Sequence, residues 1–563
     1  MAHEEFDAVV VGSGFGGAVS CHRLAQAGWR VCLLERGRRW PPGSFARTPA
    51  AFGKNFWDPS ERQFGLFDIW SFKRLDAVVG SGLGGGSLIY ANVLIRKDEK
   101  WFVREPAVKN HGHHGHREYW PVQRADLERH YDEVERVLRP VKYPLEHPHF
   151  DHIVKTRALL RSGRAVGLEA ELLPLAVSFG NDPQRPIPGE QLHDGGNLHG
   201  LPRSTCRLCG ECFLGCNFGS KNTLDLNYLS MAERLGAELR DLSEVTALRR
   251  ADSGGGFELE YVRHQPDEER PRGYRPEPRK LRCKKLVMAA GTVGSSYLLL
   301  KHRDALGLTS PMLGEKVGGN GDALMFATGC RDEQGRALDV RADLGPTITA
   351  AIRRADALDG DGASGRGAYV EEASVPPFLA WLGEFALPWK VVPNLARFAW
   401  LAWRSRRKDA DLSYEVSQLL GDARLSSGLL PLLCMGRDVA DGRFSLSGKW
   451  LDCDWSAGAS QEFFDGVRGI AAAVADKLGG QLVENPAGLL GRSTTVHPLG
   501  GCTMGDDAGS GAVDPWGRAF GAEDLVVADG SVMPGATGPN PSLTIAALAN
   551  RFAEHLVEGG RPK

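Results

Sequence analysis

The sequence predicts an α/β fold with a parallel sheet, and three observations predict it. The chain has 563 residues, of which 42% are hydrophobic and 25% are charged, so it can bury a large core. Residues 6–35 alternate strand, helix and strand, which is the pattern of a parallel βαβ unit. Near the C-terminus, the apolar strand 525–528 precedes a helix that opens at residue 541. This length allows about three domains, or one large interrupted fold.

Composition and charge exclude several classes of protein. The 68 Lys and Arg and the 70 Asp and Glu give a formal charge of −2, so there is no basic surplus for binding nucleic acid. We find no run of about 18 apolar residues that would span a membrane. The polar start of the chain does not resemble a cleavable signal. We therefore expect a cytoplasmic protein.

The βαβ unit contains a glycine pattern that is typical of dinucleotide binding. The predicted strand 6–11 is followed by Gly12, Gly14 and Gly17, with the spacing Gly-x-Gly-x-x-Gly. These glycines allow a tight turn and let a pyrophosphate approach the N-terminus of the helix. Glu35 ends the second strand, where a carboxylate accepts from the ribose hydroxyls. An acid here favours FAD or NAD over NADP, and the motif alone does not separate the first two.

Two further segments have the composition of a cofactor site. Residues 80–92 are too rich in glycine for a helix or strand interior, and such a loop brings backbone N–H groups against a flat or anionic ligand. Residues 496–502 read VHPLGGC, and Asp529 follows the strand 525–528. Residues 538–545 read GPNPSLTI, in which the second proline suits the first turn of a helix.

With these motifs in this order, the chain resembles the glucose–methanol–choline (GMC) flavin oxidoreductases, closest to their bacterial cholesterol oxidase-like branch. The resemblance covers nearly the whole chain and includes Trp120-Pro121, Asp126-Leu127 and residues 289–295. It implies a Rossmann-like FAD-binding domain of GMC type and a substrate domain with an antiparallel sheet and a lid. The FAD-binding domain would comprise residues 1–45, 75–100, 205–325 and 490–563. The substrate domain would comprise residues 46–74, 101–204 and 326–489.

The resemblance also implies the cofactor and its contacts. FAD would be bound without a covalent link, because residues 64–75 contain no His that could form one. Val245 would contact the adenine side. The other implied contacts are Gly12, Gly14, Phe15, Gly17, Glu35, Gly85, Ser87, Asp529, Gly530, Asn540 and Pro541.

Two residues of the C-terminal motifs match the catalytic pair of the family. Alcohol oxidation removes the hydroxyl proton and passes a hydride to flavin N5, so polar groups must hold the oxygen. By the resemblance, His497 binds the hydroxyl and accepts or relays its proton, and Asn540 hydrogen-bonds the substrate or the flavin. The helix at Pro541 would direct its dipole at the ring. The alternatives are an ordinary buried His497, and an Asn540 that only caps the helix.

Glu371 is the third catalytic candidate. Its segment resembles the part of cholesterol oxidase that contains the acid which shifts a steroid double bond. On a strand, Glu371 and Glu372 face opposite sides, so at most one of them points into the pocket. The alternative is an exposed strand carboxylate. Tyr90 departs from the pattern, because the oxidase branch has an Asn at that position.

Four of the 11 cysteines lie close together, at Cys206, Cys209, Cys212 and Cys216. This spacing is that of a bacterial ferredoxin half-motif, in which the first three thiolates hold one cluster. The sequence contains no second run, and Asn217 replaces the Pro that usually follows. We expect a 3Fe-4S or 4Fe-4S cluster, and some bacterial GMC dehydrogenases have a similar group of cysteines. Disulfides, free thiols and a zinc site are the alternatives.

The segment 376–408 is rich in tryptophan and ends in basic residues. This composition is typical of a helix at a membrane interface or of a lid over a lipid-like substrate, and the alternative is a buried helix with a solvated end. We expect a bulky apolar alcohol, with peripheral contact to the inner face of the membrane as a further prediction. A separate His-rich segment is interrupted by glycines and is predicted to be a loop rather than a metal site. Its histidines are His111, His113, His114 and His116.

The sequence therefore predicts an FAD-dependent dehydrogenase or oxidase for a sterol-like, terpenoid or other lipophilic alcohol. Electrons would leave through the iron–sulfur cluster to an external protein or quinone, or would pass to O2. Two other hypotheses keep the fold. One is flavin-dependent isomerisation or reduction of a double bond, and the other is a non-catalytic electron-transfer flavoprotein.

Overall fold

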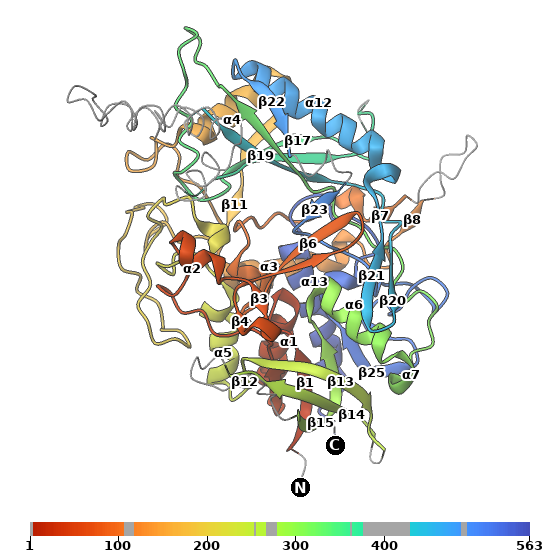
Figure 1. Cartoon of the computed structure of the whole chain (residues 1–563). Coiled ribbons are helices and arrows are strands. Elements are labelled where there is room, and N and C mark those ends of the chain that lie inside the picture. The colour runs from red at the N-terminus through yellow and green to blue at the C-terminus, as the bar shows by residue number, and fades with distance from the viewer. Residues whose placement is uncertain are drawn as a thin grey trace, which may run out of the picture.

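The computed structural model describes residues 4–105, 117–252, 255–265, 278–360, 363–374, 376, 428–485 and 492–562. Two large sheets organise these residues, one at each end of the molecule (Figure 1).

The first sheet has eight strands and a parallel core. Its central strand β1 (Glu4–Val11) pairs in parallel with β2 (Val31–Leu34) on one edge and with β15 (Pro278–Met288) on the other. Beyond β15, the sheet continues in parallel with β25 (Ala522–Val527) and antiparallel with β14 (Phe257–Arg263). β12 (Glu238–Arg240), β13 (Ser243–Arg250) and β24 (Arg518–Ala519) complete it. Helix α1 (Phe15–Gln26) joins β1 to β2, so the predicted βαβ unit is confirmed.

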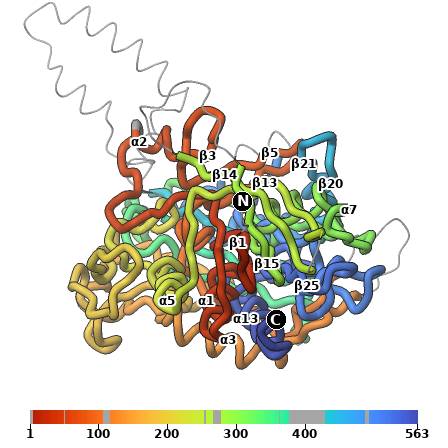
Figure 2. Tube along the Cα trace, turned by 90° about the horizontal axis from the view of Figure 1, so that it is seen from below, coloured from red at the N-terminus to blue at the C-terminus, as the bar shows by residue number. Residues whose placement is uncertain are grey.

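Helices pack closely beneath this sheet because small residues allow it. α1 packs against α13 (Ser542–Glu558) and α5 (Tyr228–Arg234), and α13 also packs against α3 (Arg124–Leu138). A Cβ on Gly16 would lie 1.4 Å from the carbonyl oxygen of Ala528, so only glycine lets α1 begin against the end of β25. Figure 2 shows the labels of α1 and α13 side by side, with the C-terminus beside α13.

The second sheet has six strands, and every neighbouring pair is antiparallel. In spatial order its strands are β10 (Glu169–Leu172), β17 (Ala350–Arg354), β18 (Ala368–Glu372), β19 (Leu430–Gly436), β16 (Ala323–Thr328) and β22 (Gln481–Glu484). Helices α4 (Val154–Ala165) and α12 (Gln461–Lys477) cover one face of it (Figure 1). All five residues of β18 are buried, because this strand lies between α4 and α12 on one side and the first sheet's loops on the other. The predicted antiparallel sheet is therefore confirmed, and the division into domains remains a prediction.

Shorter elements connect the two sheets. The helices are α2 (Pro49–Gly53), α6 (Gly291–Lys301) and α7 (Arg303–Leu306). The strands are β3 (Trp57–Asp58), β4 (Gln63–Phe64), β5 (Phe67–Ser71), β6 (Leu75–Gly80), β7 (Val103–Arg104), β8 (Glu118–Tyr119), β9 (Val141–Lys142), β11 (Pro174–Leu175), β20 (Arg443–Ser447), β21 (Trp450–Asp454) and β23 (Ser493–Thr495). The 3₁₀ helix η2 (Gly85–Leu88) lies in the glycine-rich loop.

Among the described residues, no helix is long and apolar enough to cross a bilayer. The segment predicted to contact a membrane lies outside the described residues from 377 onward, and the four histidines of the predicted loop also lie outside them.

Candidate active site

The glycine fingerprint forms a tight turn at the end of β1. Gly12 has a φ of +96°, and a Cβ there would lie 2.2 Å from the carbonyl oxygen of Ala289. A Cβ on Gly17 would lie 2.0 Å from the carbonyl oxygen of Gly12. Gly14 differs, because no described atom other than those of Gly14 and its two chain neighbours lies within 4 Å of the position of its Cβ. The turn is therefore closed at Gly12 and Gly17 and open at Gly14, which is what a bound pyrophosphate needs.

Glu35 lies buried beside this turn. Its Oε2 accepts from the backbone N–H (3.1 Å) and the hydroxyl (2.6 Å) of Ser13, and its Oε1 accepts from the N–H of Gly37 (2.8 Å). Burial raises the pKa of Glu35. Oε1 has a single donor and can still accept from a ribose hydroxyl. The N–H of Ser243 binds the carbonyl of Glu35, so β13 begins here and brings the buried Val245 to the same end of the sheet.

The glycine-rich loop packs on the fingerprint. A Cβ on Gly85 would lie 2.6 Å from the Cα of Gly14, so the two glycine segments touch through their backbones. The hydroxyl of Ser87 donates to the carbonyl of Gly84 (2.7 Å) and accepts from the N–H of Leu224 (3.1 Å). These bonds fix the loop beside the open space at Gly14.

Asn92 ends this loop, and sequence reasoning missed it. Its φ is +73°, its side chain is buried, and neither of its amide atoms has a hydrogen-bond partner. A buried amide without partners costs about 1–3 kcal/mol, so such a side chain in a cofactor loop indicates a ligand that satisfies it.

The C-terminal motifs converge on the end of β25. Asp529 accepts from the N–H (2.9 Å) and hydroxyl (2.6 Å) of Ser531 and from the hydroxyl of Ser295 (2.6 Å). Burial raises the pKa of Asp529. The carbonyl of Gly530 accepts from the N–H of Gly500, which joins the HPLGG segment to this turn.

His497 is paired with a carboxylate that sequence reasoning also missed. Its Nδ1 lies 2.7 Å from Oδ1 of Asp322, and the side chain is 15% exposed. The other oxygen of Asp322, Oδ2, accepts from the N–H groups of Val496 (2.8 Å) and His497 (3.0 Å) and from the hydroxyl of Thr495 (2.9 Å). A carboxylate only accepts, so Nδ1 is the donor, and in the neutral ring the lone pair is then on Nε2.

Asn540 faces Glu371 instead of capping the helix. Its Nδ2 donates to Oε2 of Glu371 (3.4 Å), and its Oδ1 has no partner. The N-cap position of α13 is Pro541. Glu371 is fully buried on β18, Oε1 has no partner, and burial raises its pKa well above the usual range. The alternatives of a helix-capping Asn540 and an exposed Glu371 are therefore wrong.

The neighbouring Glu372 points to the opposite face of the sheet, as strand geometry predicts. It accepts from the N–H groups of Thr349 (3.2 Å) and Ala350 (3.0 Å), and it lies 3.5 Å from the ammonium of Lys155 on α4. Since α4 covers that face, Glu371 is the carboxyl that turns toward the first sheet and Asn540.

The loop 318–322 hydrogen-bonds both to His497 and to the segment that precedes Asn540. Asp322 holds His497, and Oδ1 of Asn320 accepts from the N–H groups of Thr537 (2.9 Å) and Gly538 (3.1 Å), which precede Asn540. The loop is itself held by Asp438, whose Oδ2 accepts from the N–H of Gly319 (3.0 Å). Burial raises the pKa of Asp438 to about 6, and its Oδ1 has no partner. A carboxylate directly after a glycine-rich turn is the one signal that could have identified Asp322.

The four clustered cysteines line one small cavity, whose wall also includes Phe218 and Lys221. Burial raises the pKa of Cys206 well above the usual range, and repulsion from Cys212, Cys209 and Cys216 adds to it. All 11 cysteines lie within the described residues and all have free thiols.

The structure can be compared with the predictions of a metal site or of disulfides at these cysteines. In the part of the chain that the structure describes, no group of three or more His, Cys, Asp or Glu side chains is arranged to hold a metal ion. This finding supports neither a zinc site, which needs four ligands around one ion, nor the predicted iron–sulfur cluster, which needs at least three thiolates around it. The described cysteines form no disulfide either. The iron–sulfur cluster therefore stays a prediction from the spacing of the cysteines.

Comparisons with known proteins agree with this geometry. Residues 480–549 match the family model "GMC oxidoreductase", and residues 10–55 match the model "NAD(P)-binding Rossmann-like domain". A cholesterol oxidase of Mycobacterium tuberculosis is 31% identical to the chain over 569 residues, which cover 98% of this chain and 90% of the relative. The chain belongs to the GMC oxidoreductase family.

Two further likenesses are consistent with the family. A cholesterol oxidase of Acinetobacter baumannii is 26% identical, with 98% of this chain and 94% of the relative covered. The crystal structure of pyridoxine 4-oxidase from Mesorbium loti superposes with a TM-score of 0.52 over 98% of this chain and 99% of that chain. Since it is only 17% identical, it supports the fold alone. As a GMC oxidoreductase of the cholesterol oxidase-like branch, the chain is an enzyme.

GMC oxidoreductases bind FAD, and the described residues fit that cofactor. Gly14 faces open space, and Asn92 presents an unpartnered buried amide from the glycine-rich loop. Oδ1 of Asn540 and Oε1 of Glu371 are also buried without partners. Orphaned polar atoms at the junction of these motifs are what a bound flavin and its substrate would satisfy.

Proposed function

We propose that this GMC oxidoreductase oxidises the hydroxyl of a bulky lipophilic, sterol- or terpenoid-like alcohol to a carbonyl, with FAD bound without a covalent link. The observation that supports it best is the Asp322–His497 pair, organised by the same loop that binds the residues before Asn540. The relatives named cholesterol oxidase support a sterol-like substrate. The proposal places the enzyme in the cytoplasm, with peripheral membrane contact through 376–408.

In this mechanism, the bound flavin supplies a hydride acceptor for the alcohol carbon. His497 accepts the hydroxyl proton at Nε2, because Asp322 keeps the proton of the neutral imidazole on Nδ1. The carboxylate then stabilises the imidazolium that forms. Asn540 hydrogen-bonds the substrate oxygen, and burial of Asn540 and Glu371 excludes water from that side. The helix α13, which follows at once, directs its N-terminus at the same region.

Glu371 supports a second activity. Burial raises its pKa and so makes the carboxylate a stronger base, which could take a proton from one substrate carbon and return it to another. A second candidate function is therefore an oxygen-using cholesterol oxidase-like enzyme that also shifts the double bond of the ketosteroid product. The name "oxidase" of the relatives favours O2 as the acceptor in this case.

The main proposal includes an iron–sulfur cluster that Cys206, Cys209, Cys212 and Cys216 would hold, with a protein or quinone as the external electron acceptor. The support is the ferredoxin-like spacing, together with the small cavity that the four residues line. A cluster of this kind would supply one-electron steps, and the cysteines would bind it as thiolates.

The experiment that tests the proposed function is anaerobic mixing of the purified flavoprotein with a panel of sterols, terpenoid alcohols and long-chain alcohols. Bleaching of the flavin band near 450 nm is expected in the wild type and not in His497→Ala. Iron and sulfide assay of the same preparation tests the cluster. A wild type that no alcohol bleaches would contradict the proposal, and iron-free protein that consumes O2 would favour the second candidate.

A further inference from the structure

The segment 536–539, which leads into Asn540, is held almost entirely by two side chains. The ammonium of Lys97 donates to the carbonyls of Ala536 (2.8 Å) and Thr537 (3.0 Å). Asn320 accepts from two N–H groups of the segment and donates to the carbonyls of Gly538 (3.4 Å) and Pro539 (3.3 Å). The path of the backbone into Asn540 therefore depends on Lys97 and Asn320.

Lys97 is an unusual choice for this task. It is fully buried, and among the described residues no carboxylate lies within ion-pair distance of its ammonium. Its other neighbours are the rings of Trp120, 4.5 Å away, and Phe102, 5.3 Å away. Burying a charged amine whose partners are two carbonyls and two aromatic faces costs free energy of folding. The burial also lowers the pKa of Lys97 well below the usual range. A neutral apolar residue would suffice if only packing were required.

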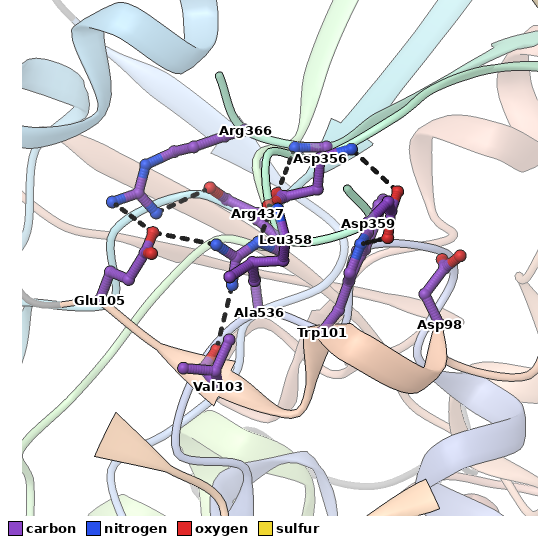
Figure 3. A network of polar contacts seen from close by, with 12 residues as sticks. Asp98, Trp101, Val103, Glu105, Asp356, Leu358, Asp359, Arg366, Arg437 and Ala536 are labelled. Atoms are coloured by element: carbon purple, nitrogen blue, oxygen red, sulfur yellow. Dashed lines mark hydrogen bonds and ion pairs between the residues drawn. The ribbon is translucent and has the colours of Figure 1, made fainter. Parts of the chain in front are cut away.

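A partly buried network of polar contacts begins at the residue after Lys97, and Figure 3 shows Asp98, Trp101 and Asp359 of this network. Asp98, the next residue, accepts from Arg353 of β17 (2.8 Å) and from the hydroxyl of Tyr369 of β18 (2.8 Å). Trp101 donates to Asp359 (2.9 Å), which also binds Arg353 (2.6 Å). The two strands of the second sheet thereby fix the segment that contains Lys97.

Trp101, which belongs to this network, also contacts the segment 536–539 directly. A Cβ on Gly538 would lie 2.4 Å from the ring of Trp101, so the loop rests directly on that ring. Tyr369 lies on the same strand as Glu371, the partner of Asn540. The contacts therefore connect the strand of Glu371, through Asp98 and Lys97, to the loop of Asn540.

We propose that Lys97 is a positioning residue for Asn540: by holding the carbonyls of Ala536 and Thr537, it places the carboxamide of Asn540 opposite Glu371. This inference rests on the proposed function, in which Asn540 hydrogen-bonds the substrate oxygen. Because a displacement of about 1 Å of a reacting group costs about a hundredfold in rate, a loosened loop slows hydride transfer while the flavin stays bound.

The test is a double-mutant cycle on the flavin-loaded enzyme, with Lys97→Met, Asn540→Ala and the combined variant. Lys97→Met is expected to slow anaerobic flavin reduction about 10- to 100-fold in the wild-type background and less than twofold in Asn540→Ala. Lys155→Met is the control, since it also loses a buried ammonium that donates to two carbonyls, those of Pro346 and Thr347, although Lys155 additionally pairs with Glu372. That control is expected to lower stability and to change the reduction rate less than threefold.

A second measurement does not need turnover. In Lys97→Met, hydrogen exchange of the peptide that contains residues 536–540 is expected to rise at least tenfold, and in Lys155→Met it is expected to stay unchanged. Equal slowing in both backgrounds, or unchanged exchange of this peptide, overturns the proposal. If no alcohol reduces the wild type, the proposed function fails and the exchange experiment still decides the role of Lys97. If Lys97→Met is insoluble, Lys97→Gln, which keeps two donors on a shorter side chain, takes its place in both measurements.

Discussion

Replacing Asp322 by Asn reverses the protonation of His497 with little change of shape. Oδ2 of Asp322 accepts from three donors, Thr495, Val496 and the N–H of His497, and Oδ1 faces Nδ1 of the ring. In Asp322→Asn, the amide oxygen must keep the position with three donors, so the NH2 group faces Nδ1. Nδ1 must then accept, and the single proton of the neutral ring moves to Nε2.

The expected loss follows from what Nε2 does in the wild type. With a proton on Nε2, the ring cannot accept the proton of the alcohol, and general base catalysis by a positioned side chain contributes about 10²- to 10⁴-fold. At 1.36 kcal/mol for each tenfold change, the barrier to flavin reduction should rise by about 3–5 kcal/mol. The hydrogen bonds at Oδ2 are retained, so stability should change by less than about 2 kcal/mol.

The assay is stopped-flow flavin reduction under anaerobic conditions, with the flavin content and melting temperature of each variant measured first. Asp514→Asn is the control, because Asp514 also accepts from two backbone N–H groups and pairs with a cationic side chain, that of Arg518. If Asp322→Asn with full flavin content is reduced within threefold of the wild-type rate, the assignment of His497 as the base is refuted.

Three other predictions follow from particular side chains. Gly14→Ala should keep the melting temperature of the flavin-free protein within about 3 °C of the wild-type value and weaken FAD binding at least tenfold. Gly17→Ala should instead destabilise the fold, because its Cβ would lie 2.0 Å from a backbone oxygen. The folded-state pKa of Asp438, about 6, lies above the usual ~3.9, so its stabilising effect is present below pH ~4 and is lost as pH rises through 6. The free energy of unfolding of Asp438→Asn, measured with urea, should therefore rise relative to that of the wild type by about 3 kcal/mol between pH 4 and pH 7. A difference between the two proteins that stays constant with pH would contradict this. Cys206→Ser should remove most of the iron and sulfide and slow electron transfer to a quinone, while flavin reduction by the alcohol stays within threefold.

The sequence predicted those parts of the fold and site that depend on local patterns. The βαβ unit follows from glycines whose Cβ positions collide with backbone, and strand alternation correctly placed Glu371 and Glu372 on opposite faces. Which of the two faces the first sheet depends on the position of α4, and no local pattern encodes that.

The contacts that organise the site were not predictable, because they join distant parts of the chain. Asp322 and His497 are 175 residues apart, and Lys97 and Thr537 are 440 apart. For Asn540, local preference favoured a helix cap, and a tertiary hydrogen bond to Glu371 outweighed that preference. Asn92 was missed because an Asn in a glycine-rich loop reads as a turn residue.

The most direct test of the central claim is the visible spectrum of the purified chain before and after a lipophilic alcohol is added without oxygen. A yellow protein whose absorbance near 450 nm disappears on addition of the alcohol, and persists in His497→Ala, is the predicted result. Protein that remains colourless after incubation with FAD, or a His497→Ala variant that bleaches as fast as the wild type, would contradict it.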